Sequence, residues 1–220
     1  MMILGIDTAL GACSAAVLDG DRVLARLHEP MQRGHAERLA PMVESVMRDA
    51  GLPFSALQRL AVTVGPGTFT GQRVSLAFVR ALALALKLPA AGVTTLDAMA
   101  EEAIGANAWA VACVDAKRGE AYLGARGQGR TLLEPILLSL SAAEAKVAAM
   151  SAHMGTAPII AGSGAALLQV EKFTSPVMQP DAVFVARLGA AEPTPTTRPR
   201  PLYLREPDAK LPEPRLPGAA

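Results

Sequence analysis

The sequence predicts an α/β protein made of two tandem β-β-β-α-β-α subdomains that face each other across a central cleft. Three observations predict this. Apolar residues make up 51% of the 220 residues, which is enough for a substantial core. Short runs with strand-like composition alternate with segments of helical periodicity. The same order of elements occurs twice along the chain, and an internal duplication of this kind decides the fold.

The first half opens with three predicted strands. MILGID at 2–7 is apolar and ends on Asp7, and ACSAAVL at 12–18 roughly alternates between apolar and polar residues. DGD at 19–21 is a hairpin turn, and RVLARL at 22–27 follows it. Period-two alternation bounded by a turn signal of this type predicts an antiparallel meander.

A helix, a strand and two further helices are expected after this meander. In the segment 34–51, apolar residues at helical spacing share one face, Pro41 interrupts that stripe, and Gly51 is a stop signal. LAVTVGPG then predicts a strand that ends in a Gly-x-Gly turn. Thr68 or Thr70 is a candidate N-cap for the next helix, and Thr94 or Thr95 for the third.

The second half repeats this plan. WAVACVD ends on Asp115 as MILGID ends on Asp7, and Gly11 and Gly119 each lie four residues after the Asp. The turns DGD and GQG each begin twelve residues after it, and TLLEPI stands where RVLARL stood. SAAEAKVAAMSA predicts a helix with the capping pair Ser141 and Glu144. PIIAGSGAAL predicts the strand and glycine turn that follow.

We therefore expect an N-terminal subdomain at 1–105 that carries partner-binding helices, and a smaller C-terminal subdomain at 106–192. A Pro-rich tail at 193–220 follows, which we expect to run extended over the surface. The formal net charge is +1, so the chain as a whole does not predict a large nucleic-acid-binding face. The N-terminus lacks a basic leader, and the longest apolar run is broken by Arg80 and Lys87, which favours a soluble cytoplasmic protein without membrane contact.

Two facing halves of this type describe the actin-like ATPase architecture, whose subdomains are RNase H-like. In that fold an acid ends the first strand of each half, and the cleft holds nucleotide and metal. Asp7 with Thr8, and Asp115, match those positions, and Gly162 and Gly164 match the turn that passes under an adenosine. The alternatives are that Asp7 is a turn or cap residue and that the glycines only make a strand-to-helix turn.

The sequence offers no catalytic residues and no metal ligands. Its histidines are His28, His35 and His153, and none of them has a second histidine four residues away on a helix face. There is no Gly-x-Ser-x-Gly nucleophile elbow. Cys13 and Cys113 lie in apolar runs, which favours buried, reduced thiols.

Several stretches together resemble one family. They are ILGIDTALGACSAAVLDG, RGHAERLAPMV, VGPGTFTGQRVSLAFVRALALAL, GVTTLDAMA, VDAKRGEAY and PLYLREPDA, in order from residue 3 to about residue 209. The chain is similar to the TsaB family of tRNA threonylcarbamoyladenosine biosynthesis proteins, in the glycoprotease-like branch of the actin-like fold.

The resemblance implies a non-catalytic accessory subunit. It implies binding to a TsaD-type catalytic paralogue, which has a paired-histidine metal site and modifies the adenosine next to the anticodon, and to a small TsaE-type ATPase. It also implies a homodimer of the isolated protein, and contact with tRNA only indirectly through the complex. No cofactor is required, while ATP or ADP with Mg²⁺ at the cleft or at the complex junction stays open.

The partner interface is expected on two apolar helices. From Val74 to Leu86 only Ser75 and Arg80 are polar, and a helix apolar all round is either buried on both sides or a contact surface. The residues expected at the interface are His35, Leu39, Met42, Val46, Arg73, Leu76, Val79, Arg80 and Ala83. The alternative is that each helix packs on its own sheet as ordinary core.

Two other functions remain open at this point. One is an ATP-dependent small-molecule kinase or acyltransferase that uses Asp7 and the cleft, and the other is a glycoprotein-directed peptidase, against which the missing histidine pair argues. Arg187, Arg198, Arg200 and Arg205 are candidates for a basic strip near the tail, with a solvated surface as the alternative.

Overall fold

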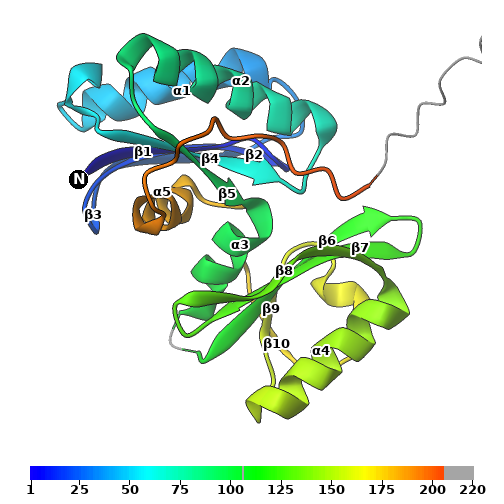
Figure 1. The fold of residues 1–220 in the computed structure, drawn as a ribbon. Coiled ribbons are helices and arrows are strands. Elements are labelled where there is room, and N and C mark those ends of the chain that lie inside the picture. Colours follow the sequence, from blue (N-terminus) through cyan, green and yellow to red (C-terminus); the bar gives the residue numbers. More distant parts are fainter. Residues whose placement is uncertain (106, 206–220) are drawn as a thin grey trace, which may run out of the picture.

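The computed structural model describes residues 1–105 and 107–205, which form two α/β subdomains stacked on one another (Figure 1). The first half contains β1 Met2–Asp7, β2 Ala12–Asp19, β3 Arg22–Pro30, α1 His35–Asp49, η1 Phe54–Ala56, β4 Arg59–Gly65, α2 Phe69–Leu86, β5 Ala90–Thr94 and α3 Thr95–Ile104. The second half contains β6 Trp109–Lys117, β7 Glu120–Gly127, β8 Arg130–Ser139, α4 Leu140–Met154, β9 Ile159–Ala161, η2 Ala165–Leu167, β10 Phe173–Thr174 and α5 Ala182–Ala191.

The two sheets have the same topology. The first has the order β3-β2-β1-β4-β5 and the second, read in the same direction, β8-β7-β6-β9-β10. In each sheet the first three strands form the predicted antiparallel meander and the fourth pairs in parallel with the first. The predicted duplication and the predicted fold class are therefore confirmed.

Each half contains one strand more than predicted. β5 and β10 pair in parallel with β4 and β9 at the edge of their sheets. β5 is short and reads AAGVT, and β10 has two residues, so neither carries a strand signal of its own. In the second half the expected helix after the glycine turn is only the single 3-10 turn η2.

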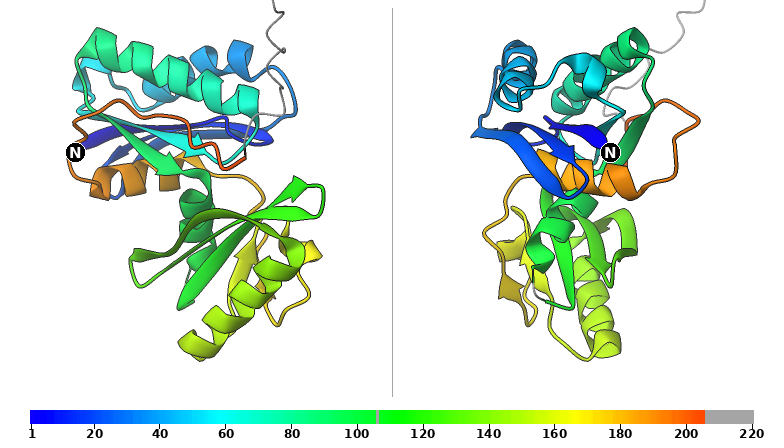
Figure 2. Two further views of the ribbon diagram at one scale, coloured as in Figure 1. Left: turned by 45° about the vertical axis from the view of Figure 1, so that its right-hand side comes forward. Right: turned by 90° about the vertical axis from the view of Figure 1, so that its left-hand side faces the viewer.

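The helices form layers on the faces of the sheets. Figure 1 and the two rotated views of Figure 2 show α1 and α2 covering one face of the first sheet, and α5 covering the other. α3 lies between the halves and packs on the second sheet, whose far face is covered by α4. Because both faces of both sheets are covered, the central strands are apolar almost throughout.

Successive residues of β1 show how the two faces of the first sheet are divided. Leu4 and Ile6 belong to the core under α1 and α2, while Ile3 belongs to the core with α5. In β6, Val111 faces α4, and Ala112 faces α3. Side chains alternate across a strand, so each strand contributes to two cores.

The last helix of each half packs on the sheet of the other half. α5 comes from the second half and contacts β1, β4 and β2, whereas α3 comes from the first half and contacts β6, β7 and β9. The divisions at residues 105 and 192 thus mark the ends of the sequence repeats. As domain boundaries they stay predictions, because α3 and α5 each pack on the sheet of the other half.

Most of the helix caps and helix ends predicted from the sequence are confirmed. Thr68 caps α2, Thr94 caps α3, and Gly51 follows α1 with a positive φ of 66°. α1 is continuous from His35 to Asp49 with Pro41 inside it, and Pro41 is exposed, so it interrupts the apolar stripe without ending the helix. The predicted capping pair of α4 is wrong, because Ser139 is the N-cap and Glu144 accepts a hydrogen bond from the Gln169 backbone N–H.

Candidate functional site at the strand ends and the helical face

Asp7 lies at the C-terminal end of β1, where it is completely buried. Its Oδ1 accepts hydrogen bonds from the Thr63 hydroxyl at 2.5 Å and from the Ala9 backbone N–H at 3.0 Å. Its Oδ2 has no partner among the described residues. Burial raises the pKa of the Asp7 carboxyl to about 7, although the hydrogen bond from Thr63 acts in the opposite direction.

The glycine-rich loop before α2 encloses this strand end. The Thr8 hydroxyl donates to the Gly71 carbonyl oxygen at 2.7 Å and accepts from the Ser75 N–H at 3.2 Å. A Cβ at Gly71 would lie 2.1 Å from the Thr8 carbonyl oxygen, and one at Gly67 would lie 2.4 Å from that of Ala9. Both glycines are therefore required for close backbone packing.

This packing decides what Asp7 and Thr8 can reach. Both residues have 0% exposure, so neither side chain offers an exposed atom to a nucleotide or a metal ion in this structure. Their predicted nucleotide contacts do not fit the geometry. The reading of Asp7 as a residue that holds a turn fits better, because it accepts from the N–H two positions along the chain.

Asp115 has different surroundings in the second half. Its carboxylate is partly exposed and accepts from the backbone N–H of Lys117 at 2.7 Å and from Lys117 Nζ at 2.6 Å. These hydrogen bonds lower the pKa of the Asp115 carboxyl. Asp7 and Asp115 thus have separate hydrogen-bond partners.

The glycine turn at 162–165 packs on β6. A Cβ at Gly162 would lie 2.3 Å from the Cys113 carbonyl oxygen, and one at Gly164 would lie 2.5 Å from Cys113 Sγ. The Gly164 N–H donates to the Cys113 carbonyl oxygen at 2.9 Å, and Ser163 Oγ accepts from the Asp115 N–H at 3.1 Å. Close backbone approach accounts for both glycines without an adenosine.

Five of the residues expected at the partner interface lie in the protein's own core. Their exposed fractions are 2% or less, because they fill the space between the first sheet and helices α1 and α2. They are Leu39, Met42, Val46, Leu76 and Val79. The interface expectation is corrected for these five residues, since the monomer leaves them almost no surface for a partner. Of the other four, Arg73 is exposed, and His35, Arg80 and Ala83 are half-buried.

An exposed apolar groove lies between the same two helices. We call it the apolar groove, and it is lined by Ala36, Leu39, Phe69, Thr70, Arg73, Val74, Ala77 and Phe78. Phe69 is 58% exposed, and Leu84 on the same helix is 67% exposed. The Arg73 guanidinium lies 3.6 Å from the centre of the Phe69 ring. Sequence periodicity predicted a wide apolar face but not which residues of it reach the surface.

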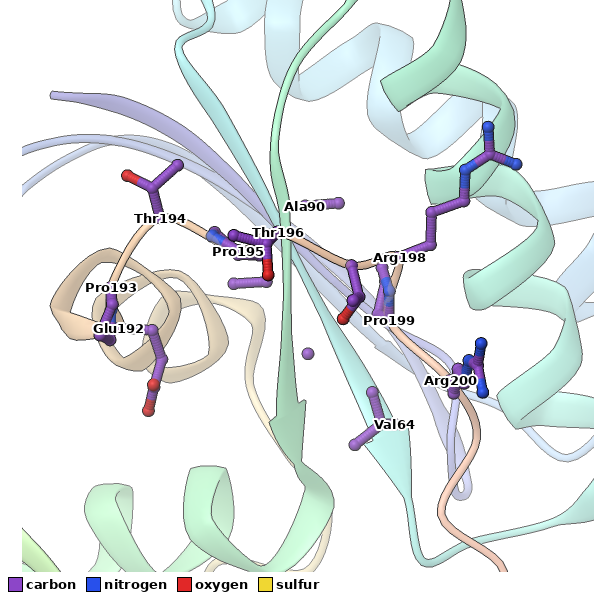
Figure 3. A pocket seen from close by; sticks show the side chains of 13 residues that line it. Val64, Ala90, Glu192, Pro193, Thr194, Pro195, Thr196, Arg198, Pro199 and Arg200 are labelled. Carbon is purple, nitrogen blue, oxygen red and sulfur yellow. The ribbon is translucent and has the colours of Figure 1, made fainter.

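The described part of the tail, 193–205, runs as a strap beside β4, β5 and α2 without forming a helix or strand (Figure 3). The Arg80 guanidinium donates to the Pro199 carbonyl oxygen at 2.9 and 2.5 Å, and the Leu202 N–H donates to the Val64 carbonyl oxygen at 2.7 Å. Arg205 donates to the Ala116 carbonyl oxygen at 2.9 Å and pairs with Glu120. The remaining tail residues lie outside the described part.

Within residues 1–105 and 107–205, no group of three or more His, Cys, Asp or Glu side chains is placed to hold a metal ion. α2 is the one helix in this part of the chain that is long and apolar enough to cross a membrane, and 28% of its length is buried.

The chain is similar in sequence to proteins of tRNA modification. The family model for TsaD, tRNA N6-adenosine threonylcarbamoyltransferase, matches residues 27–195. The tRNA threonylcarbamoyladenosine biosynthesis protein TsaB of Escherichia coli is 40% identical over 56% of this chain and 53% of that protein. The corresponding TsaB of Buchnera aphidicola is 34% identical over 60% and 63%. The matched segment thus spans roughly half to three fifths of these curated relatives.

Other relatives match along nearly the whole length. An uncharacterized protein of Mycobacterium tuberculosis is 35% identical over 94% of this chain and 93% of its own. A Pseudomonas aeruginosa crystal structure, described as an uncharacterized protein with similarity to peptidase YEAZ, has a TM-score of 0.79 at 28% identity and covers 93% of this chain and 99% of its own. The structure described as YeaZ from Pseudomonas aeruginosa has a TM-score of 0.71 at 27% identity, over 86% and 90%.

Proposed function

The chain belongs to the TsaD family and within it is similar to TsaB proteins, and we propose that it is a non-catalytic accessory subunit required for threonylcarbamoyl modification of tRNA. The modified base would be the adenosine next to the anticodon. The printed names of the relatives support the process, since several are tRNA threonylcarbamoyladenosine biosynthesis proteins. In this role the chain contributes a binding surface and no reacting group.

The observation that carries the proposal is the apolar groove. Soluble monomers seldom leave a ring such as Phe69 58% exposed beside further apolar side chains unless the patch binds something. A TsaD-type catalytic paralogue with the same fold would present a matching pair of helices. Two such pairs pack as a four-helix arrangement, with exposed residues such as Ala77 admitting close approach. We propose that a second copy of this chain occupies the same groove when the paralogue is absent.

The strand ends support an accessory role as well. Asp7 and Thr8 are enclosed, and Asp115 is held by Lys117. Close packing occupies the surroundings of Asp7, Thr8 and the glycines at 162 and 164. The Lys117 ammonium occupies the Asp115 carboxylate, so this set does not favour a nucleotide and Mg²⁺ within this chain. We therefore propose that ATP or ADP with Mg²⁺ binds at a junction of the complex, together with a TsaE-type ATPase, and that the assembly works in the cytoplasm.

The test is association of the full chain with the TsaD-type paralogue of its own organism. Size-exclusion chromatography with light scattering should give one complex, and titration should give its affinity. Ala77→Glu puts a charge at the centre of the groove on an exposed position, where it should not disturb folding. Burying that charge in an interface should weaken binding roughly 30-fold, equivalent to about 2 kcal/mol.

Ala148→Glu is the matched control, because it makes the same change at an exposed position of α4, on the other subdomain. It should leave the affinity unchanged. Separate elution of the two wild-type proteins would overturn the proposed association. ATP turnover by the isolated chain, independent of the paralogue, would favour the kinase or acyltransferase alternative instead, and cleavage of a glycoprotein by it would favour the peptidase.

A further inference from the structure

One flank of α2 carries a row of positive charges. Arg73 and Arg80 of α2 and its C-cap residue Lys87 lie seven residues apart, and positions at this spacing along an α-helix deviate from one line by only about 20° per step. The row is about 21 Å long at 1.5 Å rise per residue. The apolar groove lies on the side of α2 that faces α1, and Arg73 belongs to both the groove and this row, whereas Arg80 contacts the tail.

The tail brings further cations to this row. It runs antiparallel to α2, because Arg80 contacts Pro199 while Arg73 donates to the Tyr203 hydroxyl at 3.1 Å. Arg198 lines one cavity together with Arg80 and Lys87. Figure 3 shows Arg198 and Arg200 leaving the tail on the side of α2. We call the set of these cations the basic seam, and its members are Arg73, Arg80, Lys87, Arg198 and Arg200.

The charge of the basic seam is not neutralised by ion pairs in the described part of the chain, although Glu192 lines one cavity with Arg198 and Arg200. The whole chain is balanced, with 21 Lys and Arg against 20 Asp and Glu, yet residues 69–87 and 193–205 contain no acidic residue. Within the described part of the chain, none of the five cations has an ion-pair partner. Arg73 and Arg80 donate to neutral oxygens, which orients their guanidinium groups and leaves their charge in place.

Not all of the arginines expected near the tail join the seam. Arg205 is paired with Glu120, and the Arg187 guanidinium lies 5.3 Å from the Phe184 ring centre on α5. The strip expected from the sequence is thus replaced by a different set, in which α2 supplies Arg73 and Arg80 and its C-cap residue is Lys87. Helical spacing of seven in the sequence was the signal for these three.

We propose that the basic seam binds the phosphate backbone of tRNA directly. Four of its five cations are guanidinium groups, which match phosphate oxygens with two parallel hydrogen bonds. A row of about 21 Å is long enough for several phosphates, which a duplex strand presents about every 3.4 Å along its axis. The identity of the RNA rests on the proposed function, while the contact itself rests on the seam. An anionic membrane is less suited, because the exposed apolar side of α2 is occupied by the paralogue in the proposed complex.

The experiment compares two double variants of the full chain by fluorescence anisotropy with a labelled, unmodified tRNA transcript. Arg198→Gln with Arg200→Gln removes two seam charges whose side chains make no hydrogen bond or ion pair in the described part. Arg22→Gln with Arg130→Gln removes two exposed charges at the start of β3 and β8, the equivalent places in the two halves. Both doubles change the net charge equally.

The seam double should weaken binding roughly 25-fold at 0.1 M salt, and it should lower the slope of log affinity against log salt by about 1.4, at about 0.7 per phosphate contact. The control double should change neither quantity by a comparable amount. Equal losses for the two doubles, or no loss for the seam double, would overturn the proposal. Seam-dependent binding to vesicles of phosphatidylserine and phosphatidylcholine without binding to tRNA would also overturn it.

Association with the TsaD-type paralogue separates this proposal from the function on which it rests. The seam lies outside the apolar groove except at Arg73, which both doubles leave intact. Both doubles should therefore bind the paralogue as the wild-type chain does. If the paralogue binds and tRNA affinity is insensitive to the seam, the seam proposal fails alone. If the paralogue does not bind the wild-type chain, the proposed function fails whatever the tRNA data show.

Discussion

The unfolding free energy of the protein is expected to decrease as the pH rises, and replacing Asp7 by Asn should make that decrease much smaller. Burial raises the pKa of the Asp7 carboxyl from 3.8 to about 7 in the folded protein. The folded state therefore holds the proton more tightly than the unfolded state, so the stabilisation is fully present below pH 3.8 and is lost as the pH rises through about 7. The complete loss is roughly 4 kcal/mol, of which roughly 2.5 kcal/mol falls between pH 5 and pH 8.

The assay is urea denaturation followed by circular dichroism at pH 5 and pH 8. The Asn variant keeps Oδ1 as the acceptor for Thr63 and Ala9, and any cost of its buried amide is the same at both pH values. Its decrease in unfolding free energy from pH 5 to pH 8 should be smaller than that of the wild-type chain by roughly 2.5 kcal/mol. A pH-dependent loss will still remain in both proteins, because burial also raises the pKa of Glu102 to about 7.

Asp115→Asn is the matched control, at the equivalent position of the second half. Lys117 lowers the pKa of the Asp115 carboxyl, so this group stays ionised from pH 5 to pH 8 and its replacement should not alter the pH dependence. The reasoning is refuted if the Asp7 variant loses as much stability over this range as the wild-type chain. That result would mean that Asp7 is solvated in solution, as a nucleotide or metal ligand would be.

Two further substitutions test the packing around this strand end and around α5. Gly71→Ala should lower the unfolding free energy, measured by urea denaturation, by about 2 kcal/mol or more, because its Cβ would lie 2.1 Å from the Thr8 carbonyl oxygen. Thr70→Ala is the control at an exposed position nearby, and it should change the unfolding free energy by less than about 0.5 kcal/mol. Arg59→Met should speed amide hydrogen exchange in the last turn of α5. The buried Arg59 guanidinium donates to carbonyl oxygens there and to the Thr194 hydroxyl at 3.1 Å. Unchanged exchange would exclude the role of Arg59 in holding the end of α5.

The repeat could be predicted because the same residue spacings occur in both halves of the sequence. An Asp at a strand end, a turn twelve residues later and a Gly-x-Gly after the fourth strand follow from the chain alone, and the two sheets confirm the plan they indicate. The exchange of α3 and α5 between the sheets could not be predicted in this way. Helix α5 has apolar residues on most sides, and which sheet it covers is decided by tertiary packing, which no local pattern encodes.

The sequence predicted an apolar face on α1 and α2, but it did not predict which residues of that face are exposed. Apolar periodicity marks every residue of a wide stripe alike, so Leu76 in the core and Ala77 at the surface, which are neighbours in sequence, look equally suited to a partner. The two differ by one step of 100° around the helix, and only the position of the sheet tells which one is covered. The contacts of the tail could not be predicted residue by residue either, because several of them use backbone atoms of Pro199 and Leu202.

The glycine-rich loop at 65–71 connects these observations. Gly67 and Gly71 resemble a phosphate-binding loop in composition, yet the space that a phosphate would need is taken by the backbone of Thr8 and Ala9. The same contact buries Asp7 and sets the start of α2, whose N-cap is Thr68. This strand end is closed by backbone packing, and the helix that begins there carries residues of both the apolar groove and the basic seam. The packing that encloses Asp7 therefore also fixes the helix on which both proposed binding surfaces lie.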